Sequence, residues 1–455
     1  MAIEDDVTVV GGGLAGMTAA LAAAREGADV RLLSHKDSTL RSASGLVDVL
    51  GYDADGTLLA DPFEAIADLP DSHPYRTVGV EGVREGLALF DAVVGDRYRG
   101  DHTDRNALVA THGGSVKPTA RYPASAAPGL ASDERSVLLV GFETVTDFDA
   151  PLAADHLRAA GVPFEVEGAT VQFPGDFRAD AARTRLADAL DANERLEVGA
   201  AGSGGSGRSG RSGGGAGGGE SGYTTSLPAR KALAETVKDH LDGTERVGFP
   251  ALLGQHETDE IRADLEAELG AAVFEVPMGS PSLPGMRLEG AFQRACRDAG
   301  VRFTTGNPVV GYEERDADRH DGGVAAVRVN RNGAAIPFHA DQFVLATGGL
   351  VGKGVDSDRE GVREPIFDCH VPAPSDRYDW FADEAFGDHP FARFGVETDD
   401  DLRPLDREGE PAFSNLRAAG AVLGGSDFAA EKSGSGVSLA TGVAAGRSAA
   451  REVTR

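Results

Sequence analysis

The stretch VTVVGGGLAGMTAA, residues 7–20, places Gly11, Gly13 and Gly16 in the pattern G-x-G-x-x-G. The apolar run before the glycines predicts a β-strand, the alanine-rich run after them predicts a helix, and residues 28–33 predict a second strand. In such a unit Gly11 permits the tight turn, Gly13 lets the backbone approach a phosphate, and Gly16 lets helix and strand pack closely. Since the free N–H groups at a helix start bind phosphate, the stretch predicts a nucleotide- or flavin-binding fold.

The second predicted strand is followed by Ser34, at a position where this motif usually carries an acidic residue that binds the adenosine ribose. His35 and Lys36 come next. Three interpretations are open: FMN, which has no adenosine; NADP, with Lys36 on its 2′-phosphate; and FAD, with a ribose hydroxyl bound by Ser34. The missing acid favours FMN as the cofactor, with FAD as the alternative.

Two further stretches of small residues suit a backbone that lies close to a flat ring system. RSASGLVDVL, residues 41–50, contains Ser44 and Gly45, although a polar turn before a helix explains this stretch equally well. FVLATGG, residues 343–349, is an apolar run that ends in glycines. In a flavin fold built from two halves of the chain, Gly348 would pass near the cofactor.

The C-terminal region carries the last glycine clusters. Residues 417–423 predict a strand, and residues 436–451 predict a helix of small residues. The N-terminus of that helix would direct N–H donors and positive potential at the carbonyl side of a flavin ring. The candidate flavin contacts in this region are Gly424, Gly425, Asp427, Ser435 and Gly436.

The middle of the chain predicts a second α/β domain with a parallel sheet, because strand patterns alternate with helix patterns. The expected strands are residues 137–141, 161–166, 246–250 and 271–276, and the expected helices are residues 151–160, 228–241 and 258–269. We therefore expect a first part of the binding domain at residues 1–130, an inserted domain at 131–285, and the remainder of the binding domain, beginning with a helix at 287–299, at 286–455. Residues 202–222 are almost all Gly and Ser and predict a flexible insertion.

Composition excludes several classes of function. With 73 Asp and Glu against 44 Lys and Arg, the net charge of −29 excludes a general nucleic-acid binder and is typical of a protein from a very salty cytosol. The two cysteines are too few for a thiolate iron–sulfur cluster or a disulfide framework, and the sequence predicts no metal site. With no long apolar run and no positively charged leader, we expect a cytoplasmic protein that reaches a membrane only through a partner.

The order of the glycine motifs resembles the flavin domain of the fumarate-reductase and succinate-dehydrogenase type. Other stretches extend the likeness over nearly the whole chain, apart from the Gly/Ser insertion, and are similar to the B-subunit family of the anaerobic glycerol-3-phosphate dehydrogenases. They are SGLVDVL, HPY (residues 73–75), THGGSVKPTARYPAS (111–125), LVGFETVTDFD (139–149), SLPGMRLEGAFQRA (282–295), GVREPIFD (361–368), FGVETDDDLRP (394–404) and NLRAAGAVLGG (415–425).

This resemblance implies a discontinuous Rossmann-like flavin domain with an inserted α/β domain, and a flavin subunit usually assigned FMN. It further implies two partners at the cytoplasmic face of the membrane, namely an FAD-bearing catalytic subunit and an iron–sulfur, membrane-associated subunit. Such a complex oxidises sn-glycerol 3-phosphate to dihydroxyacetone phosphate and passes the electrons to a quinone.

The oxidation of an alcohol needs a base for its proton and cations for the substrate phosphate. Candidate bases are His112 and His370, and candidate phosphate ligands are Lys117, Arg121 and Arg363. Each of them could instead be a surface or ion-pairing residue. Three other functions stay open: a non-catalytic electron relay or scaffold in the same complex, a free-standing flavin reductase, and a structural subunit without flavin.

Overall fold

The computed structural model describes residues 3–178, 181–198, 225–315, 322–385 and 387–454. The chain divides into two compact units. The first unit comprises Met1–Val109, Lys117–Ala124 and Pro284–Arg455, and the second comprises Ala110–Val116 and Ser125–Leu283. The division into domains at residues 130 and 285 stays a prediction, and the Gly/Ser stretch at 202–222 lies outside the described residues.

The first unit is built on a seven-stranded sheet. Its order is β13 (Arg302–Thr305), β2 (Val30–Ser34), β1 (Ile3–Val10), β16 (Ala334–Leu345), β15 (Val324–Arg331) and β14 (Val309–Glu314), with β19 (Leu416–Ala418) paired to the end of β16. Strands β13, β2, β1, β16 and β19 run parallel, whereas β15 runs antiparallel to both β16 and β14. Because β2 and β16 flank β1 on opposite sides, the carboxyl end of β1 is a point where ligands bind in open α/β sheets.

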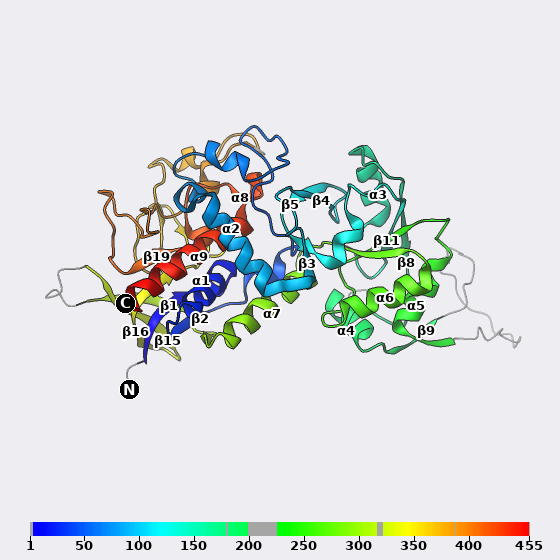
Figure 1. Ribbon diagram of the computed structural model, residues 1–455, viewed down its shortest axis with the longest axis horizontal. Coiled ribbons are helices and arrows are strands. Elements are labelled where there is room, and N and C mark those ends of the chain that lie inside the picture. Colours follow the sequence, from blue (N-terminus) through cyan, green and yellow to red (C-terminus); the bar gives the residue numbers. More distant parts are fainter. Residues whose placement is uncertain (1–2, 179–180, 199–224, 316–321, 386, 455) are drawn as a thin grey trace, which may run out of the picture. The chain divides into compact units, whose positions relative to one another are not determined.

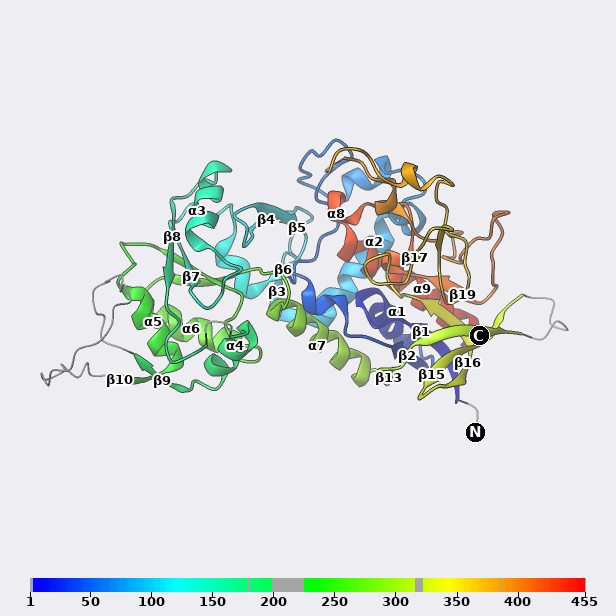
Figure 2. The ribbon, with the colours of Figure 1, turned by 180° about the vertical axis from the view of Figure 1, so that it is seen from behind.

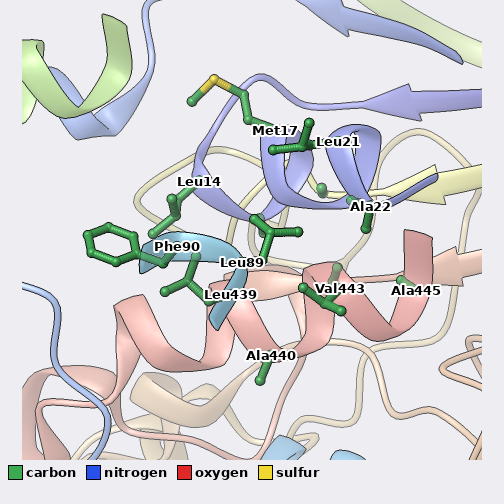
Figure 3. Packing of buried hydrophobic residues seen from close by; sticks show 14 of the residues in the cluster. Leu14, Met17, Leu21, Ala22, Leu89, Phe90, Leu439, Ala440, Val443 and Ala445 are labelled. Carbon is green, nitrogen blue, oxygen red and sulfur yellow. The ribbon is translucent and has the colours of Figure 1, made fainter. Parts of the chain in front are cut away.

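Three helices from distant parts of the chain pack together in the core of this unit (Figure 1): α1 (Leu14–Arg25), α2 (Pro74–Val94) and α9 (Gly434–Val453). Figure 3 shows Met17, Phe90 and Val443 of these helices in one apolar cluster. Helices α1 and α9 approach so closely that a Cβ on Gly446 would lie 2.2 Å from the carbonyl oxygen of Ala19. Only small residues permit this packing.

The remaining elements of the first unit are short, apart from helix α7. The α-helices and strands among them are α7 (Leu283–Asp298), α8 (Phe428–Glu431), β3 (Tyr98–Arg99), β6 (Tyr122–Pro123), β17 (Asp356–Ser357) and β18 (Val362–Arg363). The chain passes from the first unit to the second at the end of β4 (Ala107–Ala110) and returns at the start of β5 (Val116–Thr119).

The expected strand at 417–423 is wrong in its second half. Gly420 has a φ of +77°, and residues 420–422 form a 3-10 turn in place of a strand.

The second unit is an α/β unit with a parallel sheet, as the alternating pattern predicts. The sheet order is β12 (Ala272–Val276), β11 (Arg246–Pro250), β7 (Val137–Phe142) and β8 (Val166–Val171). Figure 2 shows its helices α3 (Ala150–Ala159), α4 (Arg183–Asp191), α5 (Ala229–Lys238) and α6 (Thr258–Leu269), and β9 (Arg195–Val198) with β10 (Thr225–Pro228). The strand expected at 161–166 is wrong, because Gly161, with a φ of +77°, follows α3 in a turn and β8 begins only at Val166.

Candidate functional site

A first cavity, of about 280 Å³, opens at the carboxyl ends of β1, β2 and β16. Gly11, Gly12 and Gly13 line it together with Thr347 and Gly348. Helix α1 begins after Gly13 with no side-chain cap among the described residues and with no acidic residue in its first turn. Its N–H groups and positive dipole end are therefore free to bind an anion.

The three glycines of the motif have different surroundings. A Cβ on Gly11 would lie 2.0 Å from the carbonyl oxygen of Ala346, and a Cβ on Gly16 would lie 1.9 Å from that of Gly11. A Cβ on Gly13 would meet no atom within 4 Å in the described part of the chain. Gly11 and Gly16 thus allow the strands and helix to pack, whereas Gly13 leaves open space where a phosphate would approach the helix.

The far side of the first cavity is polar. Ser34 lines it, and its Oγ donates to the carbonyl oxygen of Lys36 over 3.0 Å. Asp37, three residues beyond the usual acidic position, lines the same cavity. The buried hydroxyl oxygen of Thr347 has no hydrogen-bond partner among the residues that the structure describes. A bound nucleotide with polar groups therefore fits this cavity.

A second cavity, of about 520 Å³, lies in the same unit and is more apolar. Its lining includes Gly349, Phe394 and Leu423, and the two cavities share Thr39, Gly348 and Gly352. One extended ligand can therefore reach both. A mostly apolar cavity with a few polar groups is the usual form of a cofactor or substrate site.

The N-terminus of α9 faces the second cavity, since Gly434, Ser435 and Ser438 line it. Its N-cap residue, Ser433, gives no side-chain cap among the described residues, because its Oγ instead donates to Oε2 of Glu431 over 2.8 Å. No acidic residue occupies the first turn of the helix. Positive potential is therefore available to a ligand in this cavity.

Asp48 is the buried acidic residue of the second cavity. Its Oδ2 lies 2.6 Å from Nζ of Lys117, and its Oδ1 has no hydrogen-bond partner within the described structure. The nearby Thr119 hydroxyl donates to backbone carbonyl oxygens. Burial raises the pKa of Asp48 above its usual value, and the charge and hydrogen bond of Lys117, the neighbouring Thr119 hydroxyl and the charge of Lys432 oppose this rise only in part.

The backbone around Asp48, residues 46–51, is held by segments from three other parts of the chain. Its backbone groups pair with the carbonyl oxygen of Arg121 at 2.8 Å, the N–H of Gly436 at 2.7 Å and the hydroxyl of Tyr75 at 2.7 Å. The Gly436 N–H bonds Asp48 itself. Asp48 is therefore positioned by the fold and does not depend on a free loop.

The buried His73 and the half-buried Glu431 form a second pair beside this segment. The Nδ1 atom of His73 accepts from the N–H of Tyr75 at 3.1 Å, so its Nε2 donates to Oε2 of Glu431 at 3.2 Å. Burial alone would raise the pKa of Glu431, but the hydrogen bonds from His73 and from the Ser433 hydroxyl bring it below its usual value. Lys432, next in the chain, has a φ of +55° and lines the cavity.

The structure brings some of the sequence-predicted cofactor residues to the cavities and not others. Those that line a cavity are Gly11, Gly13, Ser34, Gly348 and Ser435. The others have structural contacts: Gly16 as described, Ser44 accepting from the N–H of Leu46, Gly45 against Pro284, Gly424 against Gly395, Gly425 against Ser72, Asp427 capping α8, and Gly436 against Tyr75. Asp427 is thus engaged by the N–H groups of Ala429 and Ala430.

The predicted substrate residues separate in a similar way. Lys117 lines the second cavity, whereas the Arg121 guanidinium is buried against both carboxylate oxygens of Asp91, at 2.8 and 2.9 Å. Arg363, which pairs with Asp358, and His370 lie outside the described lining of either cavity. His112 belongs to the second unit.

Sequence reasoning missed four side chains at or beside the second cavity: Asp48, His73, Glu431 and Lys432. They lie within the stretches SGLVDVL, HPY and the segment after residue 425, so each could have been found by asking which ionisable residues those stretches contain. Among the described residues, no group of three or more His, Cys, Asp and Glu could hold a metal ion. No helix in the described ranges is long and apolar enough to span a membrane.

Comparison with known proteins identifies the family of this chain. The E. coli quinol fumarate reductase FrdA aligns over 100% of this chain and 71% of its own, at 10% identity and a TM-score of 0.41. A family model described as "FAD binding domain" matches residues 6–437, which is nearly the whole chain. By this match, the chain is a flavin-binding α/β protein of the FAD binding domain class.

Two curated relatives narrow the family. A Halobacterium salinarum protein, named as the B subunit of a probable anaerobic glycerol-3-phosphate dehydrogenase, is 60% identical over 454 residues, which cover 100% of this chain and 99% of the relative. The corresponding B subunit of the Yersinia pestis anaerobic glycerol-3-phosphate dehydrogenase is 29% identical, with 96% of each chain covered. The chain belongs to this B-subunit family, as the sequence motifs indicate.

Proposed function

We propose that this chain is the flavin-bearing subunit of a glycerol-3-phosphate:quinone oxidoreductase and that it oxidises sn-glycerol 3-phosphate to dihydroxyacetone phosphate. Full-length identity of 60% to a relative with the matching name supports the assignment. The observation that carries the proposal for the site is the second cavity, where Lys117 and Lys432 stand beside the buried Asp48. Two cations and a hydrogen-bond acceptor suit a small alcohol that carries a phosphate.

We propose FAD as the cofactor. The missing acid at Ser34 favours FMN, but the first cavity and the family model favour FAD. The first cavity offers room for an additional group, and it shares Thr39, Gly348 and Gly352 with the second. FAD is longer than FMN by an adenylate group, for which the additional cavity would have room. Asp37 and Ser34 both line the first cavity and offer oxygens to a ribose. The family model, described as an FAD binding domain, also favours FAD.

The N-termini of two helices, α1 and α9, would bind different parts of this cofactor. The free N–H groups at the start of α1, beside Gly13, would bind the pyrophosphate. The N-terminus of α9, with Ser435, would stabilise negative charge on the ring. When bound, the flavin supplies a two-electron oxidant for an alcohol. The apolar lining at Leu423 and Phe394 would exclude water from the reacting carbon.

Electrons must then leave the flavin toward partners. With two cysteines in its sequence, this chain cannot supply the four thiolates of an iron–sulfur cluster. We therefore propose two partner subunits, one that also bears FAD and one that carries iron–sulfur clusters, with the complex at the cytoplasmic face of the membrane and a quinone as the final acceptor. The strongly acidic composition supports a salty cytosol as the compartment.

The first test is an absorption spectrum of the full chain purified in molar KCl, followed by denaturation and mass identification of the released flavin. FAD would support the two-cavity arrangement, and FMN would restore the interpretation of Ser34. Absence of flavin after reconstitution with both would contradict the proposal.

A second test locates the oxidation step. The flavin-loaded chain is mixed anaerobically with glycerol 3-phosphate, with and without the FAD-bearing partner. Bleaching in the absence of that partner supports substrate oxidation on this chain. Bleaching only in its presence assigns this chain to electron relay.

A further inference from the structure

The second cavity contains a buried acceptor that the fold leaves unused. Asp48 is 7% exposed, and Lys117 occupies Oδ2 at 2.6 Å while Oδ1 accepts no hydrogen bond from the described residues. Leaving a buried carboxylate oxygen unpaired costs free energy. Since residues 46–51 are held in place by Arg121, Gly436 and Tyr75, this arrangement is fixed by the fold.

The chemistry of the neighbouring groups indicates which ligand would pair with Oδ1. A hydroxyl group donates a hydrogen bond, which the free oxygen needs. The nearby cations are Lys117 and Lys432; Nζ of Lys432 donates to the carbonyl oxygen of Ala429 and keeps further donors for an anion. An alcohol that carries a phosphate therefore satisfies both parts of the cluster.

We propose that Asp48 is the catalytic base that accepts the proton of the substrate's secondary hydroxyl, and that Lys432 binds the substrate's phosphate. This inference rests on the function proposed above and names the residues that perform it. Lys117 is then a positioning residue, which keeps the carboxylate of Asp48 ionised and directs Oδ1 away from itself.

The O–H bond of the substrate would break and its proton would go to Oδ1 of Asp48, while the carbon–hydrogen bond would break and the hydrogen would leave with its electron pair to a two-electron oxidant, which a bound flavin would supply. The two electrons of the O–H bond become the second bond of the new carbonyl. The charged and titratable groups around Asp48 are Lys117, Lys432, Tyr75, Glu431 and His73. The raised pKa of Asp48 makes its carboxylate a stronger base than an exposed one.

The test uses the full chain loaded with flavin, without its partner subunits. We compare wild type with Asp48→Asn, which keeps the shape of the side chain, and with Asp71→Asn, which removes a charge from a 98% exposed side chain. Flavin reduction by glycerol 3-phosphate is followed in an anaerobic stopped-flow instrument. Calorimetry gives the Kd of dihydroxyacetone phosphate, which has a carbonyl group in place of the reacting hydroxyl.

We expect Asp48→Asn to slow flavin reduction by about 10²-fold or more, the range for loss of a general base, and to change the Kd of dihydroxyacetone phosphate by less than about threefold. Asp71→Asn should match wild type in both. Reduction of Asp48→Asn at the wild-type rate overturns the role of Asp48 alone. If wild type is not reduced at all, the proposed function of this chain fails, and the assignment of Asp48 falls with it.

A second variant keeps the inference testable if Asp48→Asn loses its flavin or does not fold. Lys117→Met retains Asp48 but removes the cation that lowers its pKa. The reduction rate should then fall off at a higher pH than in wild type, since the carboxylate protonates earlier on acidification. An unmoved pH profile overturns the proposal.

The role of Lys432 in binding the substrate's phosphate is tested with Lys432→Met. This variant should raise the Kd of dihydroxyacetone phosphate about tenfold, because one charge-assisted contact is lost, and an unchanged Kd overturns that assignment.

Discussion

Nζ of Lys117 lies 2.6 Å from Oδ2 of Asp48, inside a cavity that otherwise consists mainly of apolar side chains and glycines. The carboxylate is buried, whereas 23% of the Lys117 side chain is exposed. The pair is therefore asymmetric: Lys117 can regain water when its partner is removed, but Asp48 cannot.

Lys117→Met should destabilise the fold, because it leaves the buried charge of Asp48 without its counter-ion. The expected loss is about 2 kcal/mol, below the roughly 3–5 kcal/mol seen for fully buried pairs because Lys117 is partly hydrated. Chemical unfolding in molar KCl measures it. Combining Lys117→Met with Asp48→Asn removes both charges and should restore part of the loss. If the double variant is as unstable as the sum of the two single variants, the two side chains are not coupled.

Gly13→Ala should reduce flavin binding, whereas Gly11→Ala should reduce the stability of the fold. A methyl group on Gly13 enters open space in the first cavity, so the protein should fold but bind less flavin. A methyl group on Gly11, which has a φ of +121°, would lie 2.0 Å from the carbonyl oxygen of Ala346, so this variant should lose stability itself. The ratio of flavin absorbance to protein and the unfolding midpoint separate the two effects. Equal losses of stability would contradict the distinction.

Glu431→Gln should destabilise the protein in a pH-dependent way. The pKa of Glu431 is lower in the folded chain than its ordinary 4.5, so its ionised form contributes stability that is fully present above pH 4.5. That stability is lost as the pH falls through the folded pKa. We expect a deficit of about 1.5 kcal/mol at pH 7 that narrows on acidification. Unfolding curves between pH 7 and pH 3 measure it, and Glu408→Gln, at an exposed turn residue, is the matched control.

Both cysteines should resist thiol reagents in the folded protein. Cys296 and Cys369 are buried, and burial raises the pKa of Cys296 to about 12 and that of Cys369 well above its usual value. Because the thiolate is the reactive form, a disulfide-based thiol reagent at pH 8 should label neither residue. Both should react once denaturant is added. Rapid labelling of the native protein would show that the core opens on the timescale of the assay.

Salt should stabilise the fold. A net charge of −29 repels itself in dilute buffer, and added KCl screens that repulsion. The thermal unfolding midpoint should rise steadily from millimolar to molar KCl. Addition of sucrose at low ionic strength is the control for a general solvent effect. A midpoint that does not move with salt would show that the acidic surface does not determine stability.

The sequence predicts the scaffold of the site well because glycine spacing and apolar periodicity act locally. The strand–turn–helix at residues 7–20 and the parallel sheet of the second unit both follow from such patterns. The 3-10 turn at residues 420–422 could not be read in this way, because the apolar pattern of a strand continues through it and only the positive φ of Gly420 ends the strand.

The ionisable residues of the site are harder to predict for a different reason. Asp48 and Lys117 meet only in the folded chain, and neither residue has a local pattern that marks it as functional. Lys117 could be proposed from its charge alone, but Arg121, four residues later, could be proposed equally well and is instead paired with Asp91. Burial separates these alternatives, and burial is set by contacts that the linear pattern does not contain.

The position of α9 has a consequence for how the protein folds during its synthesis on the ribosome. Its first turn bonds Asp48 and lines the second cavity, and its length packs on α1 and α2, which are made first. A ribosome-bound chain that has not yet emerged beyond residue 433 leaves the faces of α1 and α2 uncovered and one wall of the cavity missing. Cofactor loading thus has to wait until α9 has been made, and a chain interrupted before α9 would expose apolar helix faces that cellular quality control can recognise.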